Sequence, residues 1–413
     1  MKNLFIILFI FLSVNLFSQT KEFNIEKAVY YLASEQLQGR LPATNGDTLA
    51  VEFVASVFKD FNIKPFFPTY YQEVVFKEMR SIATNSKQAG PKSEITRNVV
   101  GVIEGSDPIL KNEYIVIGAH LDHLGLGGVM SGSMSKEQGK VHYGADDNAS
   151  GVSLMLDLAR KFSDSPTKRS IIFIAFACEE KGLIGSKQFL EGLPFETSKI
   201  VGMLNFDMVG KLKGNKLTVG GSKTSNKAEK IIKRYSKQYD LNVTLSKSGV
   251  APSDHASFYA KYIPVFYFTT GADSTYHTPY DVPENINYKG IELLSSYAFD
   301  IANDVANMKT KLKFKKVKEP KSKGSMASMK VTLGIMPDVT GSTTEGLKAE
   351  VVSGGKPADK AGMVNGDIII ELNGKKVKDI YSYMEILGKL EPGSTINAKI
   401  KRDGKVKELI IKL

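Results

Sequence analysis

Residues 170–180 read SIIFIAFACEE, an almost uninterrupted apolar run that ends in two glutamates. A short run of this kind is typical of a strand that is buried on both faces of a sheet. Similar runs occupy residues 98–104, 114–119, 200–207 and 263–269. Segments with helical spacing of apolar residues precede and alternate with them, at 25–36, 47–60, 151–162, 183–190, 227–239 and 291–308. The alternation predicts an α/β domain in which helices cover both faces of a mostly parallel, mixed sheet.

The length and composition suit two globular domains. The chain has 413 residues, of which 42% are hydrophobic and 24% are charged. A formal net charge of +11 raises nucleic acid as a partner, but much of the excess lies in one tract, residues 309–323. No module that combines aromatic and basic residues accompanies this tract. We therefore interpret it as solvated and expect no nucleic-acid partner.

The N-terminus, residues 1–18, has the layout of a secretory signal peptide. Lys2 precedes an apolar run at 4–17, and the small residue Ser18 precedes a polar stretch. The run is shorter than the roughly 20 apolar residues that a membrane span needs, although a retained anchor is the alternative. The only cysteine, Cys178, excludes an intramolecular disulfide. We expect export to the periplasm or the medium, and no stable membrane span after the signal is removed.

A change of composition divides the rest of the chain. Residues 311–325 are rich in lysine and contain Pro320 and Gly324, which predicts a basic linker. The linker would join a first domain at 20–310 to a second domain at 326–413. The short strands expected in the second domain predict a small, mainly-β fold.

Histidines and acids gather where the expected strands end. They are His120 and Asp122 after 114–119, Asp146 and Asp147 before 151–162, Glu179 and Glu180 after 170–177, Asp207 at the end of 200–207, and His277 after 263–269. In open α/β sheets, ligands bind in the crevice beyond the carboxyl ends of the strands. We therefore expect these side chains to converge on one crevice.

Several carboxylates in one crevice require cations that neutralise them. Imidazole and carboxylate ligands suit zinc, and a set of this size suggests a paired site. Two metal ions about 3.5–4 Å apart can hold a bridging water and lower its pKa. One carboxylate must stay off the metals to accept the proton of that water. The pair Glu179 and Glu180 could supply both kinds of carboxylate.

These segments resemble the co-catalytic di-zinc aminopeptidases typified by secreted bacterial leucine aminopeptidases. The resemblance covers about residues 25–308, where five motifs occur in the order of that family. It implies a zinc-exopeptidase fold, two zinc ions and a Glu general base. By this resemblance, His120 and Asp207 would bind one zinc ion, and Glu180 and His277 would bind the other. Asp147 would bridge the two ions. Glu179 would act as the general base and then as the general acid.

The resemblance also implies roles for residues around the ions. Asp122 would orient His120 by accepting its other ring proton, with a simple loop cap as the alternative. A cis peptide bond would join Asp146 to Asp147. His123 is expected in the loop or behind the ligands, because the ligand roles are already filled.

Three more residues are candidates for substrate contacts. Asp254 and His255 match a recurrent family segment near the substrate pocket, but they could equally cap the helix that follows. Tyr276 could donate a hydrogen bond to the developing oxyanion, or it could pack in the core. His142 is expected at the surface or at the mouth of the site.

The second domain resembles a bacterial PDZ domain. The loop with Leu333, Gly334 and Ile335 resembles the PDZ loop whose backbone N–H groups receive a peptide's terminal carboxylate. Segments 357–362 and 365–374 follow in the PDZ order, and a helix at 380–387 would form one wall of the groove. Peptide C-termini are the implied partners. The alternative is a domain that docks on the first domain or aids assembly.

The favoured function is an exported zinc-dependent aminopeptidase that hydrolyses N-terminal residues from peptides with free N-termini. A metal-bridging water and a Glu general base would carry the reaction. Two alternatives remain. One is an enzyme like glutaminyl cyclase, which shares this fold but works with one zinc. The other is a non-catalytic binding protein on the same scaffold, which would typically have lost ligands.

Overall fold

The computed structural model describes residues 22–78, 92–128, 131–135, 137, 139–317, 331–337, 343, 345–352 and 355–413. The expected signal peptide lies outside these residues. Among the helices of the described part, none has the length and apolar character required to span a bilayer.

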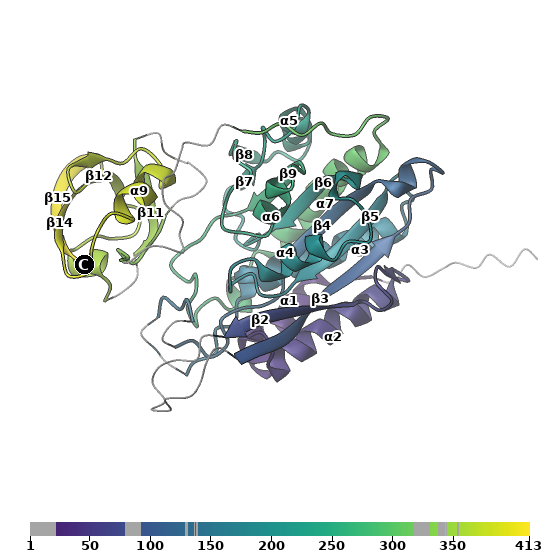
Figure 1. The fold of residues 1–413 in the computed structure, drawn as a ribbon, viewed down its shortest axis with the longest axis horizontal. Coiled ribbons are helices and arrows are strands. Elements are labelled where there is room, and N and C mark those ends of the chain that lie inside the picture. Colours follow the sequence, from purple (N-terminus) through teal and green to yellow (C-terminus); the bar gives the residue numbers. More distant parts are fainter. Residues whose placement is uncertain are drawn as a thin grey trace, which may run out of the picture.

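The first domain is built on one mixed sheet (Figure 1). Its order is β1-β3-β5-β4-β6-β9-β7-β8, with β2 paired to β3. The four central strands β5, β4, β6 and β9 run parallel, whereas β3 and β7 flank them in antiparallel pairs. The strands are β1 Lys64–Pro65, β2 Tyr71–Glu78, β3 Lys92–Ile103, β4 Tyr114–His120, β5 Ser170–Phe176, β6 Ile200–Phe206, β7 Lys216–Gly220, β8 Asn242–Leu245 and β9 Val265–Thr269.

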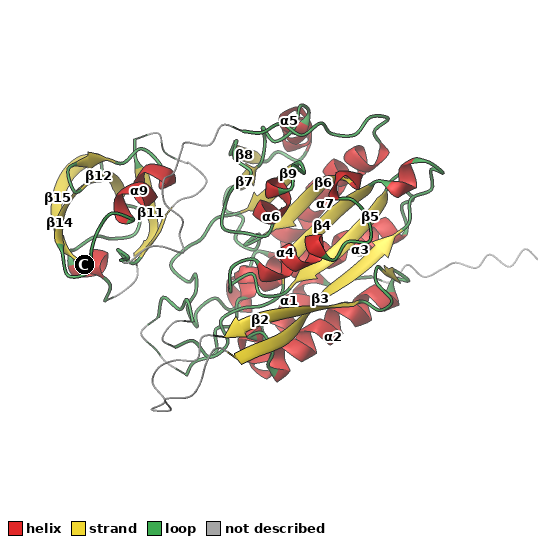
Figure 2. Ribbon diagram, in the orientation of Figure 1, coloured by secondary structure: helices red, strands yellow, loops and turns green. Residues whose placement is uncertain are grey.

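Helices cover both faces of this sheet (Figure 2). Because side chains alternate along a strand, Ile115 and Ile117 of β4 enter one apolar core and Val116 enters another. The first core includes residues of α1, α2, α3, α5 and α7, and the second includes residues of α4 and α6. The helices are α1 Ile25–Leu32, α2 Asn45–Asp60, α3 Gly151–Ser163, α4 Ile184–Glu191, α5 Ala228–Gln238, α6 His255–Ala260 and α7 Tyr288–Asn307. The predicted α/β architecture is confirmed.

The second domain has a separate core and an antiparallel sheet. The sheet order is β10-β11-β12-β14-β15, with β13 paired to β12. Asp379 and Ser382 form a capping box at the start of α9. The elements are β10 Ile335–Pro337, β11 Leu347–Val352, α8 Pro357–Lys360, β12 Ile368–Leu372, β13 Lys375–Lys376, α9 Ile380–Leu387, β14 Thr395–Arg402 and β15 Lys405–Lys412. The predicted small, mainly-β domain is confirmed.

The described start of the expected linker, residues 311–317, packs on the first domain. Leu312 is only 3% exposed and belongs to the first core. The Phe314 ring lies 5.4 Å from that of Tyr259, and Phe314 forms a β-bridge with Ser225. The main-chain N–H of Val317 donates to the Tyr259 hydroxyl. The apolar side chains within this basic tract therefore attach its first half to the first domain.

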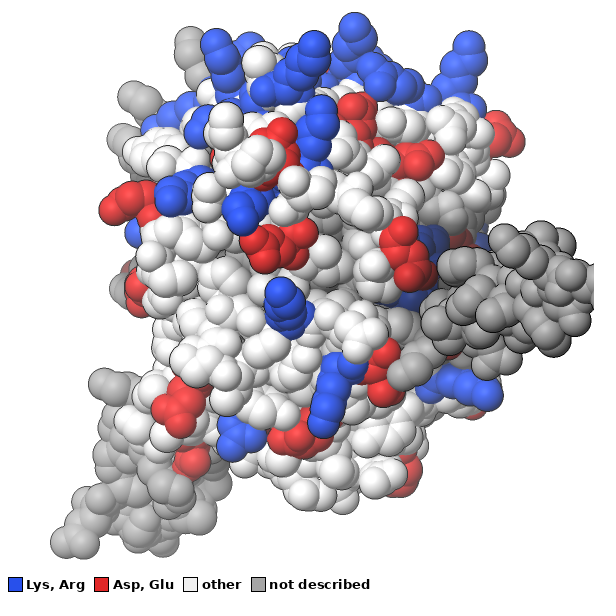
Figure 3. Space-filling model, turned by 90° about the vertical axis from the view of Figure 1, so that its right-hand side faces the viewer, with Lys and Arg blue, Asp and Glu red and all other residues white. Residues whose placement is uncertain are grey.

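Basic side chains gather along one edge of the first domain. Helix α5 exposes Lys230, Lys233, Arg234 and Lys237 at the top of Figure 1, and Figure 3 shows Lys and Arg side chains concentrated along the top of the molecule. Two of these charges are paired, Lys233 with Glu229 and Arg234 with Asp304.

Candidate metal centre

The five predicted ligands converge beyond the carboxyl ends of the central strands. His120 ends β4, Asp207 follows β6, and Asp147 lies in the short helical turn η3 (Ala145–Ser150). Two groups of potential ligand atoms result, and within each group the atoms lie within 4.8 Å of one another. The groups are His120, Asp147 and Asp207, and His123, Asp147, Glu180 and His277.

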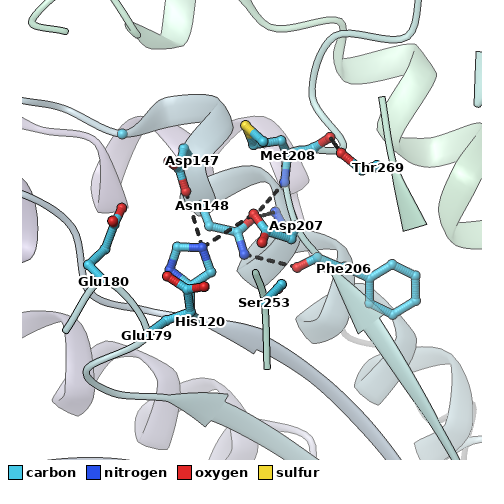
Figure 4. A network of polar contacts seen from close by, with 12 residues as sticks. His120, Asp147, Asn148, Glu179, Glu180, Phe206, Asp207, Met208, Ser253 and Thr269 are labelled. Carbon is cyan, nitrogen blue, oxygen red and sulfur yellow. Dashed lines mark hydrogen bonds and ion pairs between the residues drawn. The ribbon is translucent and has the colours of Figure 1, made fainter. Parts of the chain in front are cut away.

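Asp147 is shared by the two groups. Its Oδ1 lies 3.1 Å from Nε2 of His120, and its Oδ2 lies 3.0 Å from Nε2 of His277. His120 Nε2 also lies 3.3 Å from Oδ1 of Asp207, as Figure 4 shows. His277 Nε2 lies 3.1 Å from Oε1 of Glu180. One carboxylate thus faces two separate sites, which is the geometry that a bridging ligand requires.

The electrostatics of both groups favour a cation beside the histidines. Burial would lower the pKa of His120, but the charges of Asp207 and Glu179 outweigh it and raise this pKa well above the usual range. Burial would raise the pKa of Glu180, but His277 outweighs it and lowers this pKa to about 2. The carboxylates that favour a proton on each ring would equally favour a metal ion there.

Nε2 of His277 provides a direct test of whether a metal fits. The atom is buried and makes no well-directed hydrogen bond with any described residue, although two carboxylate oxygens lie near it. A buried ring nitrogen that faces two carboxylate oxygens without a directed hydrogen bond is placed as a metal ligand would be. The donor set therefore fits zinc.

His123 lies in the second group, which the sequence analysis did not expect. Its Nδ1 is 3.1 Å from Oε1 of Glu180 and 4.0 Å from Oδ2 of Asp147. The side chain is fully buried, and its ring packs edge-on against that of His277. The position three residues after His120 in the same loop was the only sequence signal. His123 either positions Glu180 or is a further ligand.

Asp122 does orient His120, but through a different atom from the one expected. Nδ1 of His120 lies 3.2 Å from the backbone carbonyl oxygen of Asp122. The Asp122 carboxylate instead accepts the N–H groups of Glu179 (2.9 Å) and Glu180 (3.3 Å). The prediction was wrong because this side chain turns towards the end of β5. Burial raises the pKa of Asp122 to about 7.

Glu179 lies beside His120 and belongs to neither ligand group (Figure 4). Burial raises the pKa of the Glu179 carboxyl well above its usual range, and the charges of Glu180 and Asp207 reinforce this against the opposing effect of His120. A carboxyl in this setting is able to hold a proton near neutral pH.

The cis peptide bond joins Asp147 to Asn148, and not Asp146 to Asp147 as expected. Asn148 is fixed on both sides of its amide. Its Nδ2 donates to the carbonyl of Phe206, and its Oδ1 accepts the N–H of Gly151. The Asp146 carboxylate points away from the histidines and accepts the N–H of Gly210 at 2.7 Å.

Of the candidate substrate residues, Asp254 and His255 are buried and Tyr276 is half-buried. Among the described residues, neither Asp254 oxygen has a hydrogen-bond donor, so this carboxylate does not cap α6, and burial raises its pKa to about 7. The His255 ring stacks on Tyr267 at 4.3 Å and lines a small pocket. Tyr276 stacks on His277 at 3.8 Å, beside the second ligand group. His142 is also buried, and its Nε2 lies 2.7 Å from the Ser133 hydroxyl.

Two residues that the sequence analysis missed support the centre. Arg40 is 1% exposed and donates to the carbonyls of Leu121, Tyr143 and Gly144, beside the ligand loops. Burial lowers its pKa to about 10. Asp281 is equally buried and accepts N–H groups of the Asp147 loop. No local pattern marks Arg40, whereas Asp281 lies in the same loop as His277.

The loop of the second domain has the expected glycine. Gly334 has φ 74°, and a Cβ there would meet the Lys356 side chain at 2.1 Å. Its N–H donates to the Thr332 hydroxyl, and the Leu333 carbonyl accepts the N–H of Ala358. Ile335 begins β10 and pairs with Val352.

Sequence comparison finds relatives for both domains. Residues 98–302 match peptidase family M28, and residues 331–413 match the PDZ domain family. Leupeptin-inactivating enzyme 1 of Streptomyces exfoliatus is 34% identical over 182 residues, which cover 43% of this chain and 36% of that protein. Aminopeptidase YwaD of Bacillus subtilis is 33% identical over 199 residues, which cover 43% of this chain and 40% of that protein. The chain thus spans about two fifths of the length of these curated relatives.

Solved structures show the same fold. BSAP, a zinc aminopeptidase from Bacillus subtilis, has a TM-score of 0.55 and 17% identity, over 70% of this chain and 98% of that one. Glutaminyl cyclase from Bacteroides thetaiotaomicron has a TM-score of 0.52 and 16% identity, over 68% of this chain and 98% of that one. The two likenesses establish the fold alone, and the motif resemblance is confirmed by the family matches. The chain therefore carries a peptidase domain of family M28 followed by a PDZ domain.

Proposed function

We propose that the protein is an exported, two-zinc aminopeptidase that releases N-terminal residues from peptides with free N-termini. The observation that carries this proposal is the position of Asp147, whose two oxygens face two separate groups of buried histidines and acids. A shared carboxylate between two such groups suits a pair of metal ions. The match to peptidase family M28 supports peptide hydrolysis.

In the proposed centre, His120 and Asp207 would hold one zinc, Glu180 and His277 would hold the other, and Asp147 would contribute to both sites. When bound, the two ions would polarise the scissile carbonyl and lower the pKa of the attacking water. The acids that surround the centre attract the α-ammonium group of a substrate and favour peptides with a free N-terminus over blocked ones.

Glu179 is the proposed general base and acid. Its carboxylate takes the proton of the attacking water and then gives it to the nitrogen of the leaving amine. The hydrogen bond from the Glu179 main chain to Asp122 fixes the glutamate beside His120 and off the ligand set. Burial among other acids gives the carboxyl the affinity for a proton that both steps need.

One assay separates this function from its alternatives. Purified protein is offered aminoacyl substrates, N-blocked substrates and a peptide with N-terminal glutamine, each with and without a chelator. An aminopeptidase releases only the unblocked aminoacyl group and stops when metal is removed. Cyclisation of the glutaminyl peptide without hydrolysis would favour a glutaminyl cyclase. Zinc binding without turnover of any substrate would favour a binding protein.

Export and the PDZ domain complete the proposal. The apolar leader at 1–18 supports a cleaved signal peptide, which the mass of the protein's mature N-terminus tests. The loop around Gly334 supports binding of peptide C-termini by the PDZ domain, which would hold the tail of a longer substrate near the metal centre.

A further inference from the structure

A buried ion cluster lies behind the proposed bridging ligand. Asp281 and Lys211 are 1% and 9% exposed, respectively, and neither belongs to a candidate ligand group. Lys211 Nζ lies 3.5 Å from Oδ1 of Asp281 and 2.9 Å from Oδ1 of Asp273. Taking an isolated carboxylate out of water is costly, so a buried Asp281 needs partners of this kind.

Asp281 receives three consecutive N–H groups of the bridging loop. The N–H of Ala145 donates to its backbone carbonyl at 3.1 Å. The N–H of Asp146 donates to its carboxylate (3.1 and 3.0 Å), and the N–H of Asp147 donates to Oδ2 at 3.0 Å. Successive N–H groups that converge on an anion form a nest, which fixes the local backbone. The carboxylate thereby holds the main chain from which the Asp147 side chain projects.

The same cluster connects three ligand-bearing loops. Asp281 lies four residues after His277, in one loop. Lys211 follows Gly210, whose N–H donates to the Asp146 carboxylate at 2.7 Å, and this loop begins at Asp207. The loops that carry Asp147, Asp207 and His277 therefore meet at two side-chain contacts, Asp281 with Lys211 and Asp146 with Gly210.

We propose that Asp281, anchored by Lys211, is a positioning residue that sets the geometry of the metal centre by holding Asp147 between His120 and His277. The inference rests on the proposed zinc site. Residues that support metal ligands typically change metal affinity by about 10- to 100-fold when they are mutated. Asp281 acts here on the backbone of the shared ligand, so its loss affects both ions.

The test compares Asp281→Asn with Asp273→Asn. Asp273 contacts the same lysine but makes no described contact with residues 145–147, so its variant controls for disturbance of Lys211. Zinc affinity is measured by competition with a chromophoric chelator, and the melting temperature of the zinc-free protein is measured alongside.

Asp281→Asn retains one oxygen that can accept an N–H group, but it loses the second oxygen and the charge. We expect zinc affinity to fall about 10- to 100-fold with a zinc-free melting temperature like that of the unmutated protein. Asp273→Asn should stay within about twofold.

A second variant, Lys211→Met, keeps the test decisive if Asp281→Asn does not fold. It should weaken zinc binding in the same direction, and Lys211→Arg should restore most of the affinity. Unchanged zinc affinity in Asp281→Asn or Lys211→Met would overturn the inference. Equal losses in Asp281→Asn and Asp273→Asn would also overturn it, because they would indicate a general structural effect. Failure of the unmutated protein to bind zinc would instead refute the proposed function.

Discussion

Nδ1 of His277 lies 3.1 Å from the backbone carbonyl of Gly132, which leaves Nε2 of the same ring facing Oδ2 of Asp147. His120 repeats the arrangement, with Nδ1 near the carbonyl of Asp122 and Nε2 near Oδ1 of Asp147. A carbonyl accepts only from a protonated nitrogen, so each ring keeps a proton on Nδ1, and Nε2 is the nitrogen that a metal ion can bind in place of a proton. The backbone thus decides which nitrogen of each ring faces Asp147.

Asp147→Asn should deplete both metal positions. In the unmutated protein, one Asp147 oxygen faces each of the two ligand groups. The amide of the variant has no charge and only one oxygen, so it cannot serve both groups. The zinc content after dialysis should fall from about two ions per chain to below one. Elemental analysis of the dialysed proteins measures this content. A variant that retains both ions would show that Asp147 is not the bridge.

Glu179→Gln should separate chemistry from metal binding. The side chain belongs to neither ligand group, so the zinc content should stay near that of the unmutated protein. Loss of the proton acceptor should lower kcat by about 10²- to 10⁴-fold. Steady-state kinetics on an aminoacyl substrate, with elemental analysis of the same sample, provide both values. Metal loss as large as that of Asp147→Asn would make Glu179 a ligand instead of the base.

The sequence predicted the sheet and the converging ligands for a clear physical reason. Buried parallel strands need continuous apolar runs, and their polar residues therefore occur just past the strand ends, as His120 and Asp207 do. The position of the Asp122 side chain was not predictable in this way. Both the carbonyl and the carboxylate of that residue lie near His120 and the β5 end, and only the folded backbone decides which atom contacts the ring.

The supporting residues escaped prediction because their partners are distant in sequence. Arg40 donates to carbonyls 81 to 104 residues further along the chain, and no local spacing records such contacts. Asp281 reaches Asp146 across 135 residues. The hairpin of β2 with β3 was also missed, since Val75 and Ile95 are exposed and do not form a buried apolar run.

Asp47, which belongs to neither ligand group, should make stability depend on pH. Its carboxylate accepts hydrogen bonds from Thr96 and Ala43, but burial raises its pKa from 3.8 to about 6. The folded state binds the proton more tightly than the unfolded state, so stability is lost as the pH rises from about 4 to 6. The loss attributable to this group reaches up to about 3 kcal/mol at pH 7.

Asp47→Asn removes this titration. Its free energy of unfolding, measured with urea from pH 4 to 8, should exceed that of the unmutated protein increasingly as the pH rises, up to a plateau above about pH 6.5. Both proteins carry the same metal centre, so its own pH dependence cancels in the difference. Parallel curves would show that the Asp47 carboxyl does not titrate differently in the two states.

The start of the basic tract should behave as part of the catalytic domain. A chain that ends at residue 317 keeps Leu312 in the core and Phe314 against Tyr259, whereas a chain that ends at 308 loses both. Burying one large apolar side chain contributes about 1.5–3 kcal/mol. The shorter chain should therefore melt about 5 to 10 °C lower in a calorimetric scan. Equal melting temperatures would mean that residues 309–317 are dispensable for folding.

The chain that ends at residue 317 also tests where catalysis resides. All five proposed ligands and Glu179 lie before residue 318, so kcat/KM on short aminoacyl substrates should stay within about twofold of the full chain. Longer peptides should be hydrolysed less well, because the shortened chain lacks the PDZ domain that is proposed to raise their effective concentration near the centre. Loss of all activity with the fold retained would show that the PDZ domain completes the active site.

The PDZ loop should discriminate between charged and neutral peptide ends. Gly334 holds a positive φ that places the loop backbone beside Lys356, and its N–H is already bonded to the Thr332 hydroxyl. That hydroxyl keeps its own proton, so it can donate to a carboxylate together with the remaining N–H groups of the loop. A peptide with a free, apolar C-terminal residue should add as a strand beside β10 (Ile335–Pro337) and α9 (Ile380–Leu387).

Amidation of this peptide removes the charge of its terminal carboxylate and should lower the affinity at least about tenfold, or 1.4 kcal/mol, in a calorimetric titration. Gly334→Val should abolish the preference, since a Cβ at this position has no room beside Lys356. Equal binding of free and amidated peptides by the unmutated domain would reject the carboxylate site and favour a domain that serves only in docking or assembly.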